Sequence, residues 1–380
     1  MSLRRRKPKQ EEESPFRPLG TIFGNKHPKT FNWAKSWIEY DYENYMYSTL
    51  QELYKNVNPS PLSSDIDFKL IKERDVHLGI EVEMELGTDT QAALFGGTNQ
   101  YPGWFIKEDH SLRDGGAEFI SWPLLPRDVP KIISVLEIFF KYKRINPSFS
   151  WRTSNHVHLD VRNLRLSELI SLLLIYIVLE NVLFEFSSPG RRETNIFCTP
   201  LTRTDMYLVG ELLRIEVPTR TCLYPLFNSL RKYSALNLNR IIDYGTVEFR
   251  HLRGTLDSSF MTKWISVILK IYEASIKFSP EKLERTILTL NTSSEYEEFL
   301  VSVVGESLSN LFIGPNYKFL LSKGISCAKE LLFGLKIERK LKVSKDAGIY
   351  KFIELQNKVS KPDRLKIRAK NQGSIATGTF

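Results

Sequence analysis

The sequence predicts an α+β fold in which a layer of helices covers one face of a largely antiparallel sheet. Strand-like segments come early in the chain, and helical patterns intervene between them at irregular intervals. Three segments, 79–86, 155–161 and 246–252, alternate apolar residues with acidic or imidazole residues, which is the period of a half-buried strand. We expect the apolar side of these strands to pack against helices and the polar side to form one concave surface.

The polar sides of the three segments are rich in potential metal ligands. Successive side chains of a strand point to opposite faces, so the following groups each share a side: Glu81, Glu83 and Glu85; His156 and His158; Glu248 and Arg250. Any one segment could be an ordinary strand with a solvated face. However, like charges about 6.7 Å apart along a strand raise one another's pKa unless a cation intervenes. Carboxylates suit Mg²⁺ or Mn²⁺, and Mn²⁺ accepts an added imidazole more readily.

The remaining elements follow from local patterns. We expect disorder to about Pro28, helices over 31–57 and a break at 58–61. A Gly-rich loop at 96–97 precedes a strand pair, 104–109 and 117–121, joined by a turn at 114–116. Helices are predicted over 129–142, 167–186, 206–214, 258–276, 280–289 and 295–304. The predicted organisation is a disordered tail at 1–28, an N-terminal helical segment at 29–70, a catalytic domain at 71–335 and a basic C-terminal tail at 336–380.

Composition narrows the class of protein. The 380 residues contain only three widely spaced cysteines, which favours neither a disulfide framework nor a zinc ribbon and indicates a reducing compartment. The apolar run 169–179 is shorter than a membrane span and predicts a buried helix with Ser167 as its N-cap. The net charge of +9 is concentrated at the two ends of the chain. Nucleic acid is therefore a candidate partner only through the basic tails.

A set of motifs occurs in a characteristic order along the chain. The motifs are Gly79-x-Glu81-x-Glu83, Asp109-x-Ser111-Leu112, Glu118-Phe119-Ile120-Ser121-x-Pro123, His156-Val157-His158, Arg191-Arg192 through Pro200, Tyr233 to Leu238, and Thr246 to Arg250 ending in Gly254-Thr255. Together they resemble the amidoligase family, which has the carboxylate–amine ligase fold of glutamine synthetase and glutamate–cysteine ligase. The resemblance spans roughly residues 75–256, and the chain looks like one of the phage-encoded members. One departure is that Ser154-Asn155 stands where a Cys-Gly or Gly-Gly pair often precedes the histidine motif.

The resemblance implies an ATP-dependent ligase that forms an amide bond through an acyl phosphate. It implies one Mg²⁺ or Mn²⁺ ion on Glu81, His156 and Glu248, and a second on Glu83 and Glu118. Arg250 would contact the transferring phosphoryl group, and His158 would meet substrate or make a structural hydrogen bond. Asn237 and Arg191 are further candidates for binding ATP, although a surface arginine is the ordinary interpretation of Arg191. Glu85, Asp109, Ser111, Arg192 and Arg253 are weaker candidates, and Asp109 and Ser111 could simply cap a turn.

Two other classes of function stay open at this point. A metal-dependent hydrolase would use the same cluster to activate water, and a non-catalytic virion or scaffold protein would keep the fold without the chemistry. For the ligase, the expected partners are a carboxylate substrate and an amine substrate, such as an amino acid, a peptide or a cell-wall fragment. We expect a cytoplasmic protein, in the host cytoplasm if the chain is phage-encoded.

Overall fold

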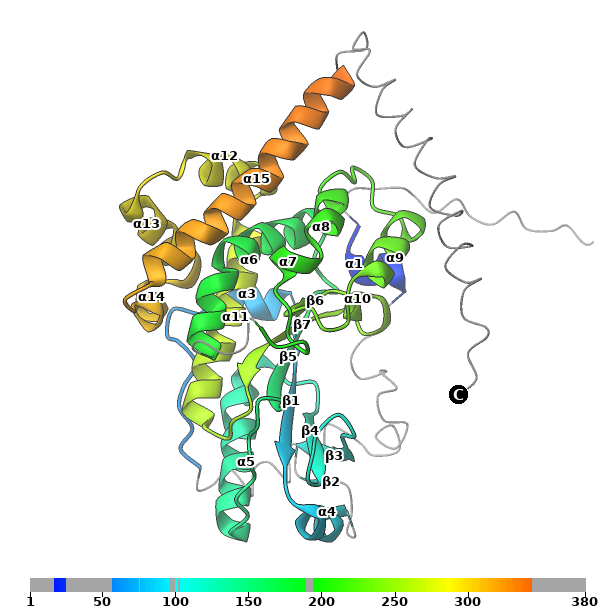
Figure 1. Cartoon of the computed structure of the whole chain (residues 1–380), viewed down its shortest axis with the longest axis vertical. Coiled ribbons are helices and arrows are strands. Elements are labelled where there is room, and N and C mark those ends of the chain that lie inside the picture. Colours follow the sequence, from blue (N-terminus) through cyan, green and yellow to red (C-terminus); the bar gives the residue numbers. More distant parts are fainter. Residues whose placement is uncertain are drawn as a thin grey trace, which may run out of the picture. The chain divides into compact units, whose positions relative to one another are not determined.

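The computed structural model describes residues 17–24, 57–74, 76–95, 100–101, 103–188 and 194–343 (Figure 1). The chain divides into two compact units, 1–329 and 330–380. All strands of the described residues lie in the first unit. The last helix, α15 (Tyr317–Val343), runs through the boundary predicted at residue 335, and its end is the described part of the second unit.

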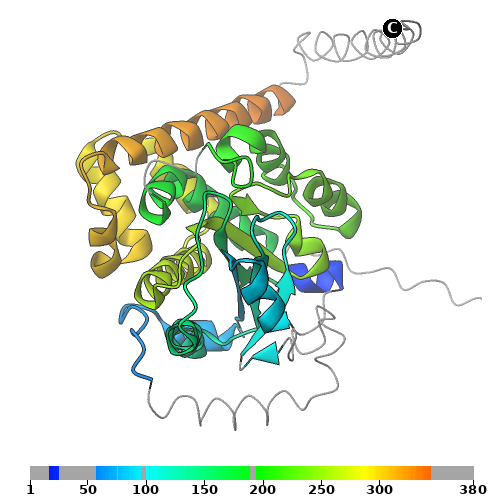
Figure 2. The same ribbon diagram turned by 60° about the horizontal axis from the view of Figure 1, so that its bottom comes forward.

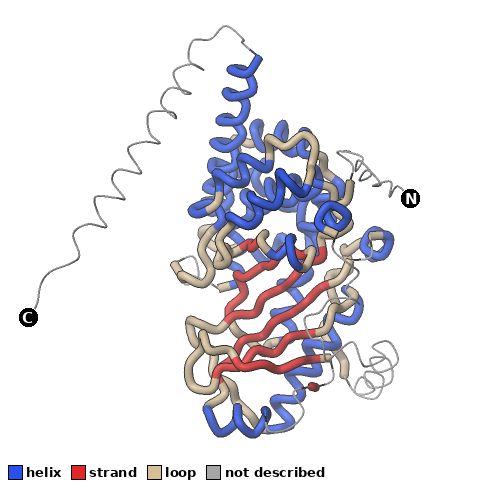
Figure 3. The backbone as a smooth tube through the Cα atoms, turned by 90° about the vertical axis from the view of Figure 1, so that its right-hand side faces the viewer, coloured by secondary structure: helices blue, strands red, loops and turns tan. Residues whose placement is uncertain are grey.

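The core of the first unit is a seven-stranded sheet in the order β2-β3-β4-β1-β5-β7-β6 (Figure 3). Every neighbouring pair is antiparallel, so the predicted α+β class is confirmed. The two-residue edge strands β2 and β6 were not expected from the sequence. The bounds are β1 Leu78–Glu85, β2 Gln100–Tyr101, β3 Trp104–Glu108, β4 Gly116–Ser121, β5 Ser154–Asp160, β6 Leu236–Asn237 and β7 Thr246–Arg253.

Helices α5 (Val129–Lys143), α6 (Leu166–Ser187) and α11 (Ser258–Lys277) lie on one side of the sheet (Figure 2). The apolar side of the strands faces them, as predicted. Phe249 of β7, for example, is fully buried and meets the rings of Tyr176 in α6 and Trp264 in α11. Burying a side chain of this size stabilises the fold by about 1.5–3 kcal/mol. The packing of the helices against this face therefore stabilises the sheet, and the opposite face can carry charged residues.

Helix α6 differs from the expectation in two respects. Its N-cap is Arg165 and not Ser167, because the Glu168 carboxylate accepts a hydrogen bond from the Arg165 backbone N–H at 2.8 Å. The helix is also 22 residues long, and it is the one helix of the described chain that is apolar and long enough to cross a membrane. Of its most apolar window, 83% is buried inside the protein, as the predicted buried helix requires.

Residues 17–24 are the described part of the N-terminal region. Residues Leu19–Phe23 form helix α1, Leu19 is fully buried and its N–H donates to the Leu164 carbonyl at 2.9 Å, so the prediction of disorder is wrong for this stretch. Of the helices predicted over 31–57, only Val57 is described, and it is not helical; the loop at 96–97 also lies outside the described residues. The remaining helices are α3 Phe68–Glu73, α4 Thr88–Phe95, α7 Leu201–Thr204, α8 Met206–Leu212, α9 Arg220–Ser229, α10 Arg240–Asp243, α12 Pro280–Thr289, α13 Ser293–Val304 and α14 Glu306–Ser309, with 3-10 turns at Pro126–Asp128 and Asn310–Phe312.

Candidate metal-binding active site

The register of the sheet aligns the polar residues in transverse rows on the face away from α5, α6 and α11. Residues directly opposite each other on antiparallel strands have neighbouring side chains on one face. One row is Lys107, Glu118 and Glu83; the next is Ile120, Glu81 and His156; the third is Gly79, His158, Glu248 and Asn237. The predicted convergence of acidic and imidazole groups on one face is therefore present.

Glu81 is the centre of the cluster. Its Oε2 lies 3.1 Å from Nδ1 of His156, and its Oε1 lies 3.1 Å from Nε2 of His158. Burial alone would raise the pKa of this carboxyl, but the charge of His158 and the hydrogen bonds of both imidazoles hold it well below its usual range. The same contact raises the pKa of His158 against the effect of burial. At neutral pH Glu81 is thus an ionised carboxylate with an imidazole at each oxygen.

Two groups of three residues have ligand atoms within 4.8 Å of one another, which is close enough for each group to hold a cation. The first is Glu81, His158 and Glu248, and the second is Glu81, Glu118 and His156. His158 takes the place of the predicted His156 in the first group, but His156 Nδ1 also lies 3.1 Å from Glu81 Oε2 and 3.4 Å from Glu248 Oε1, so the predicted set of Glu81, His156 and Glu248 stays a prediction. Glu83 belongs to neither group. Glu81 is common to both groups, so it would be a ligand of an ion held by either of them.

Glu248 is fully enclosed by donors. Oε1 meets Arg250 Nη1 and lies 3.4 Å from His156 Nδ1, and Oε2 accepts from Asn237 Nδ2 at 2.7 Å and from Arg240 Nε at 3.4 Å. Burial opposes ionisation, but the charges of Arg250 and the two histidines lower the pKa of Glu248 to about 2. Asn237 therefore supports this carboxylate, while its predicted contact with ATP stays a prediction.

The pKa of Glu118 is shifted in the opposite direction to that of Glu248. Burial and the negative charge of Glu81 raise its pKa well above the usual value, although Lys107 forms an ion pair with it. Two carboxylates that repel each other in a buried site are the arrangement that a divalent cation relieves, because the cation favours the ionised form of both. The charge balance of the donor set therefore fits a divalent ion at the second group.

Ser154 fills the position at which the sequence departs from the family pattern. Its hydroxyl donates to Glu83 and lies 2.7 Å from Nε2 of His156. Since Nδ1 of the same imidazole faces Glu81, the ring is held at both nitrogens. Glu83 thus contributes to the site mainly by holding Ser154 and His156, and its predicted role as a direct ligand stays a prediction.

Arg250 is held by a loop as well as by Glu248. Its Nε donates to the Phe197 carbonyl at 3.2 Å, and its backbone N–H donates to Ala235 at 2.9 Å. Beneath the sheet, the next residue, His251, lies 2.9 Å from the hydroxyl of Tyr176, which donates to Glu180. Glu180 is buried in the middle of α6 and also accepts from the Leu201 N–H at 2.6 Å, so it fixes the chain just after the Phe197 loop.

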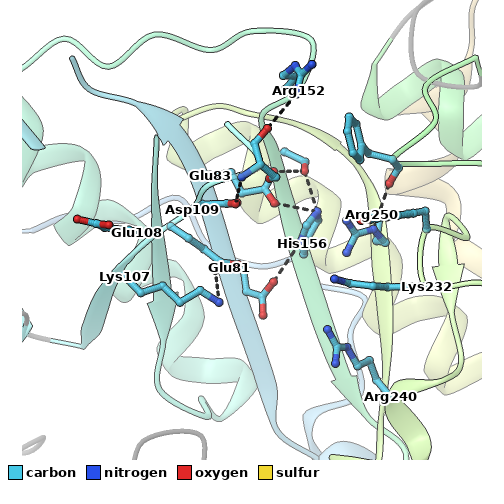
Figure 4. Close-up of a pocket in the computed structure, with 15 residues that line it drawn as sticks. Glu81, Glu83, Lys107, Glu108, Asp109, Arg152, His156, Lys232, Arg240 and Arg250 are labelled. Carbon is cyan, nitrogen blue, oxygen red and sulfur yellow. Dashed lines mark hydrogen bonds and ion pairs between the residues drawn. The ribbon is translucent and has the colours of Figure 1, made fainter. Parts of the chain in front are cut away.

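The cluster opens into a cavity of about 300 Å³. Figure 4 shows Glu81 and Glu83 on one side of His156, and Lys232, Arg240 and Arg250 along the other. Lys107 lies on the side of Glu81, where it pairs with Glu118. The carboxylates on this side and the three cations on the other suit a ligand that carries phosphate groups together with metal ions. The other residues that line the cavity are Lys107, Glu108, Asp109, Ser111, Glu118, Arg152, Ser154, Phe197 and Tyr233.

The structure places the weaker candidate residues in different positions relative to the cavity. Asp109 and Ser111 line the cavity and also form the expected turn, with the Ser111 N–H donating to Asp109 Oδ1 at 2.8 Å. Glu85 points to two loops instead of the cluster, accepting from the Arg113 N–H at 3.2 Å and from Ser150 Oγ at 3.0 Å. Arg191 and Arg192 lie outside the described residues.

Sequence reasoning missed several residues of the cavity. Lys107 was placed on a strand, but its pairing with Glu118 depends on β3 lying beside β4. Arg152 and Phe197 lie on loops, which have no periodicity that predicts the direction of a side chain. Lys232, Tyr233 and Arg240 flank the two-residue strand β6, which local patterns did not reveal, although Tyr233 belongs to one of the motifs of the resemblance.

Residues 107–272 match a family model described as "putative amidoligase enzyme". The match supports an amidoligase family and, through it, an enzyme of the ligase class. The matched segment contains Glu118, His156, His158, Glu248 and Arg250, whereas Glu81 and Glu83 precede it, so the sheet itself joins the two sets. No curated protein matches the chain.

Proposed function

We propose that the protein is an ATP-dependent carboxylate–amine ligase that forms an amide bond through an acyl phosphate. The observation that carries this proposal is the pair of three-residue ligand groups that share Glu81 and lie in one cavity with Arg250. The match to the amidoligase model supports the same class of reaction.

In this reaction an oxygen of the substrate carboxylate attacks the γ-phosphorus of ATP, and ADP leaves. The amine then attacks the acyl carbon, and phosphate leaves as the nitrogen loses a proton. Bound Mg²⁺ or Mn²⁺ would neutralise phosphate charge. The residues that would hold the ions are Glu81, His158 and Glu248 in one group and Glu118 and His156, with Glu81, in the other.

The chain's own residues would position the reacting groups. The planar guanidinium of Arg250 is held by Glu248 and the Phe197 carbonyl, which keeps it beside the ligand groups. A donor fixed before the reaction stabilises developing phosphoryl charge without reorganising, which is the usual source of large electrostatic effects in such sites. Lys232 and Arg240 add positive charge on the same wall.

The proposal is tested by incubating the full chain with ATP, Mg²⁺ and pooled amino acids or peptides, and by following both condensation products and ADP by mass. Amide products that require ATP and appear with equivalent ADP are the expected result. Cleavage of pool members without ATP would identify a hydrolase instead. Failure of the protein to bind Mn²⁺ or an ATP analogue with a non-hydrolysable β–γ bond would leave the scaffold interpretation.

A further inference from the structure

Lys107 brings a positive charge into the second ligand group. It lies directly opposite Glu118 in the register of β3 and β4, so the two side chains are neighbours on one face of the sheet. Its ammonium group forms an ion pair with Oε2 of Glu118, and Glu118 is one of the three residues of that group. A cation of the chain itself therefore holds a carboxylate that a divalent ion would need.

Lys107 is held less firmly than Arg250, another cation of the cavity. The Arg250 side chain is 9% exposed, and both Glu248 and the Phe197 carbonyl bind it. The Lys107 side chain is 49% exposed, and Glu118 is the only residue of the described chain that its ammonium group pairs with. An ion pair with one exposed member contributes little net stability, because solvent screens it. The protein therefore loses little when Lys107 leaves Glu118.

Glu118, by contrast, cannot follow Lys107 into solvent. Its side chain is 7% exposed, and its strand lies between β1 and β3 in the sheet. Its ligand atom lies within 4.8 Å of those of Glu81 and His156, and two carboxylates this close repel each other unless a positive charge lies beside them. A divalent ion supplies that charge and at the same time repels the ammonium group of Lys107.

The cavity offers the Lys107 side chain a second position. Lys107 is one of the residues that line it, and the four-carbon stem of a lysine is flexible. In the proposed function the ligand carries phosphate groups together with metal ions. An ammonium group that an ion repels from Glu118 can turn towards those phosphates without leaving the cavity.

We propose that Lys107 is an exchangeable counter-ion of Glu118: its ammonium group pairs with Glu118 until a divalent ion binds to the second group, and then turns to an anionic group of the bound ligand. This inference rests on the ligand groups of the proposed function. Lys107 thus competes with the ion, whereas a residue that orients a ligand strengthens ion binding. The second group should accordingly fill more readily when the ion arrives together with an anionic ligand.

The inference is tested first with Mn²⁺ alone, added to the full chain and followed by electron paramagnetic resonance of free Mn²⁺. Lys107→Met removes the charge but keeps an unbranched side chain, and it should bind Mn²⁺ about tenfold more tightly than the wild type. Lys107→Arg keeps the charge and should stay within about threefold of the wild type. An unchanged affinity in Lys107→Met overturns the inference, and so does a weaker one, which would show that Lys107 orients Glu118.

Two controls separate a local exchange from a general effect of charge. Lys141→Met removes the lysine of another Lys–Glu pair, in which Nζ of Lys141 lies 2.6 Å from Oε1 of Glu137, and it should leave Mn²⁺ affinity unchanged. In a Glu118→Gln background Lys107→Met should give no gain, because the carboxylate for which the two cations compete is gone. A gain of the same size in that background would assign the effect to long-range repulsion and overturn the inference.

The same variant should have the opposite effect on an anionic ligand. At saturating Mn²⁺, Lys107→Met should bind the non-hydrolysable ATP analogue about tenfold less tightly, because the released ammonium group is missing; isothermal titration calorimetry measures this. An unchanged affinity for the analogue would overturn the inference. Neither measurement needs turnover, so both effects in a protein that forms no amide would contradict the proposed ligase and leave the exchange at Glu118 in place.

Discussion

The two faces of the sheet use the same strands for opposite purposes, and β7 shows the contrast within three residues. Phe249 is fully buried among the rings of α6 and α11, whereas its neighbours Glu248 and Arg250 are buried as charges on the other face. Burial of apolar surface stabilises the fold, while burial of paired charges adds little net stability because both lose water. We call the side that packs against α5, α6 and α11 the helix face, and the side that carries Glu81, His156 and Glu248 the site face. Substitutions on the helix face should therefore change mainly the free energy of unfolding, and substitutions on the site face should change mainly activity and ligand binding.

The largest expected effect is on the helix face. Phe249→Ala should lower the free energy of unfolding by about 3–5 kcal/mol, because the cavity left between α6 and α11 adds to the lost burial. Urea denaturation followed by circular dichroism measures this change. A cost below about 1 kcal/mol would mean that the helix face does not govern folding as the comparison requires.

The second largest effect is expected on turnover, at Arg250, which follows Phe249 in β7 and lies on the site face. Arg250→Lys should lower ligase turnover by about 10²-fold or more, on the scale of losing one preorganised donor, while binding of the ATP analogue persists. The free energy of unfolding should fall by less than about 1 kcal/mol, since Lys keeps the positive charge beside Glu248. Equal turnover of the variant and the wild type at saturating ATP would remove the assignment to phosphoryl transfer.

A smaller effect is expected at Ser154, which holds His156 and Glu83 without belonging to either ligand group. Ser154→Ala should weaken Mn²⁺ binding about tenfold, the lower end of the range for residues that orient a ligand, with stability nearly unchanged. Electron paramagnetic resonance of free Mn²⁺ measures it. The matched control is Ser150→Ala, since Ser150 contacts Glu85 and not the cluster.

The alternation of residues predicted which side chains share a face, and for this reason the convergence of Glu81, His156 and Glu248 was foreseeable. It could not predict which imidazole meets which carboxylate, because that depends on register. Between Asn155 and Val157 the partner strand advances by three residues, from Leu252 to Phe249, and this bulge sets Arg250 beside the Phe197 loop.

Residues on loops were beyond prediction for a different reason. The position of Arg152 follows from contacts of Glu85 and Asn195 that link distant parts of the chain, and these contacts leave no local periodicity in the sequence. The N-cap of α6 was missed by two residues because Glu168 satisfies the Arg165 backbone, although Ser167 has the commoner capping side chain. Long periodic segments were therefore predictable, whereas the loops between them and the exact ends of the helices were not.

The smallest expected effect is on the pH dependence of stability and concerns the Glu137 carboxylate in the helix layer. Glu137 of α5 accepts from Lys141 Nζ at 2.6 Å and from the Ser258 N–H, at the start of α11, at 3.3 Å. Burial is the largest single effect and raises its pKa, but the hydrogen bonds of Lys141 and Ser258 together outweigh it and lower the pKa from its usual value. A lowered pKa means that the ionised form stabilises the fold at pH values above the unfolded value, and that this stabilisation is lost as the pH falls through the folded value.

Glu137→Gln should accordingly lower the free energy of unfolding by no more than about 1 kcal/mol at pH 7, since the pair is partly exposed and screened by solvent. The difference from the wild type should shrink as the pH falls from 5 towards 3. Urea denaturation at each pH measures it, with the exposed Glu298→Gln in α13 as the baseline. A difference that stays constant over this range would show that the Glu137 side chain acts through packing and not through its charge, although it links α5 to the start of α11 by a hydrogen bond.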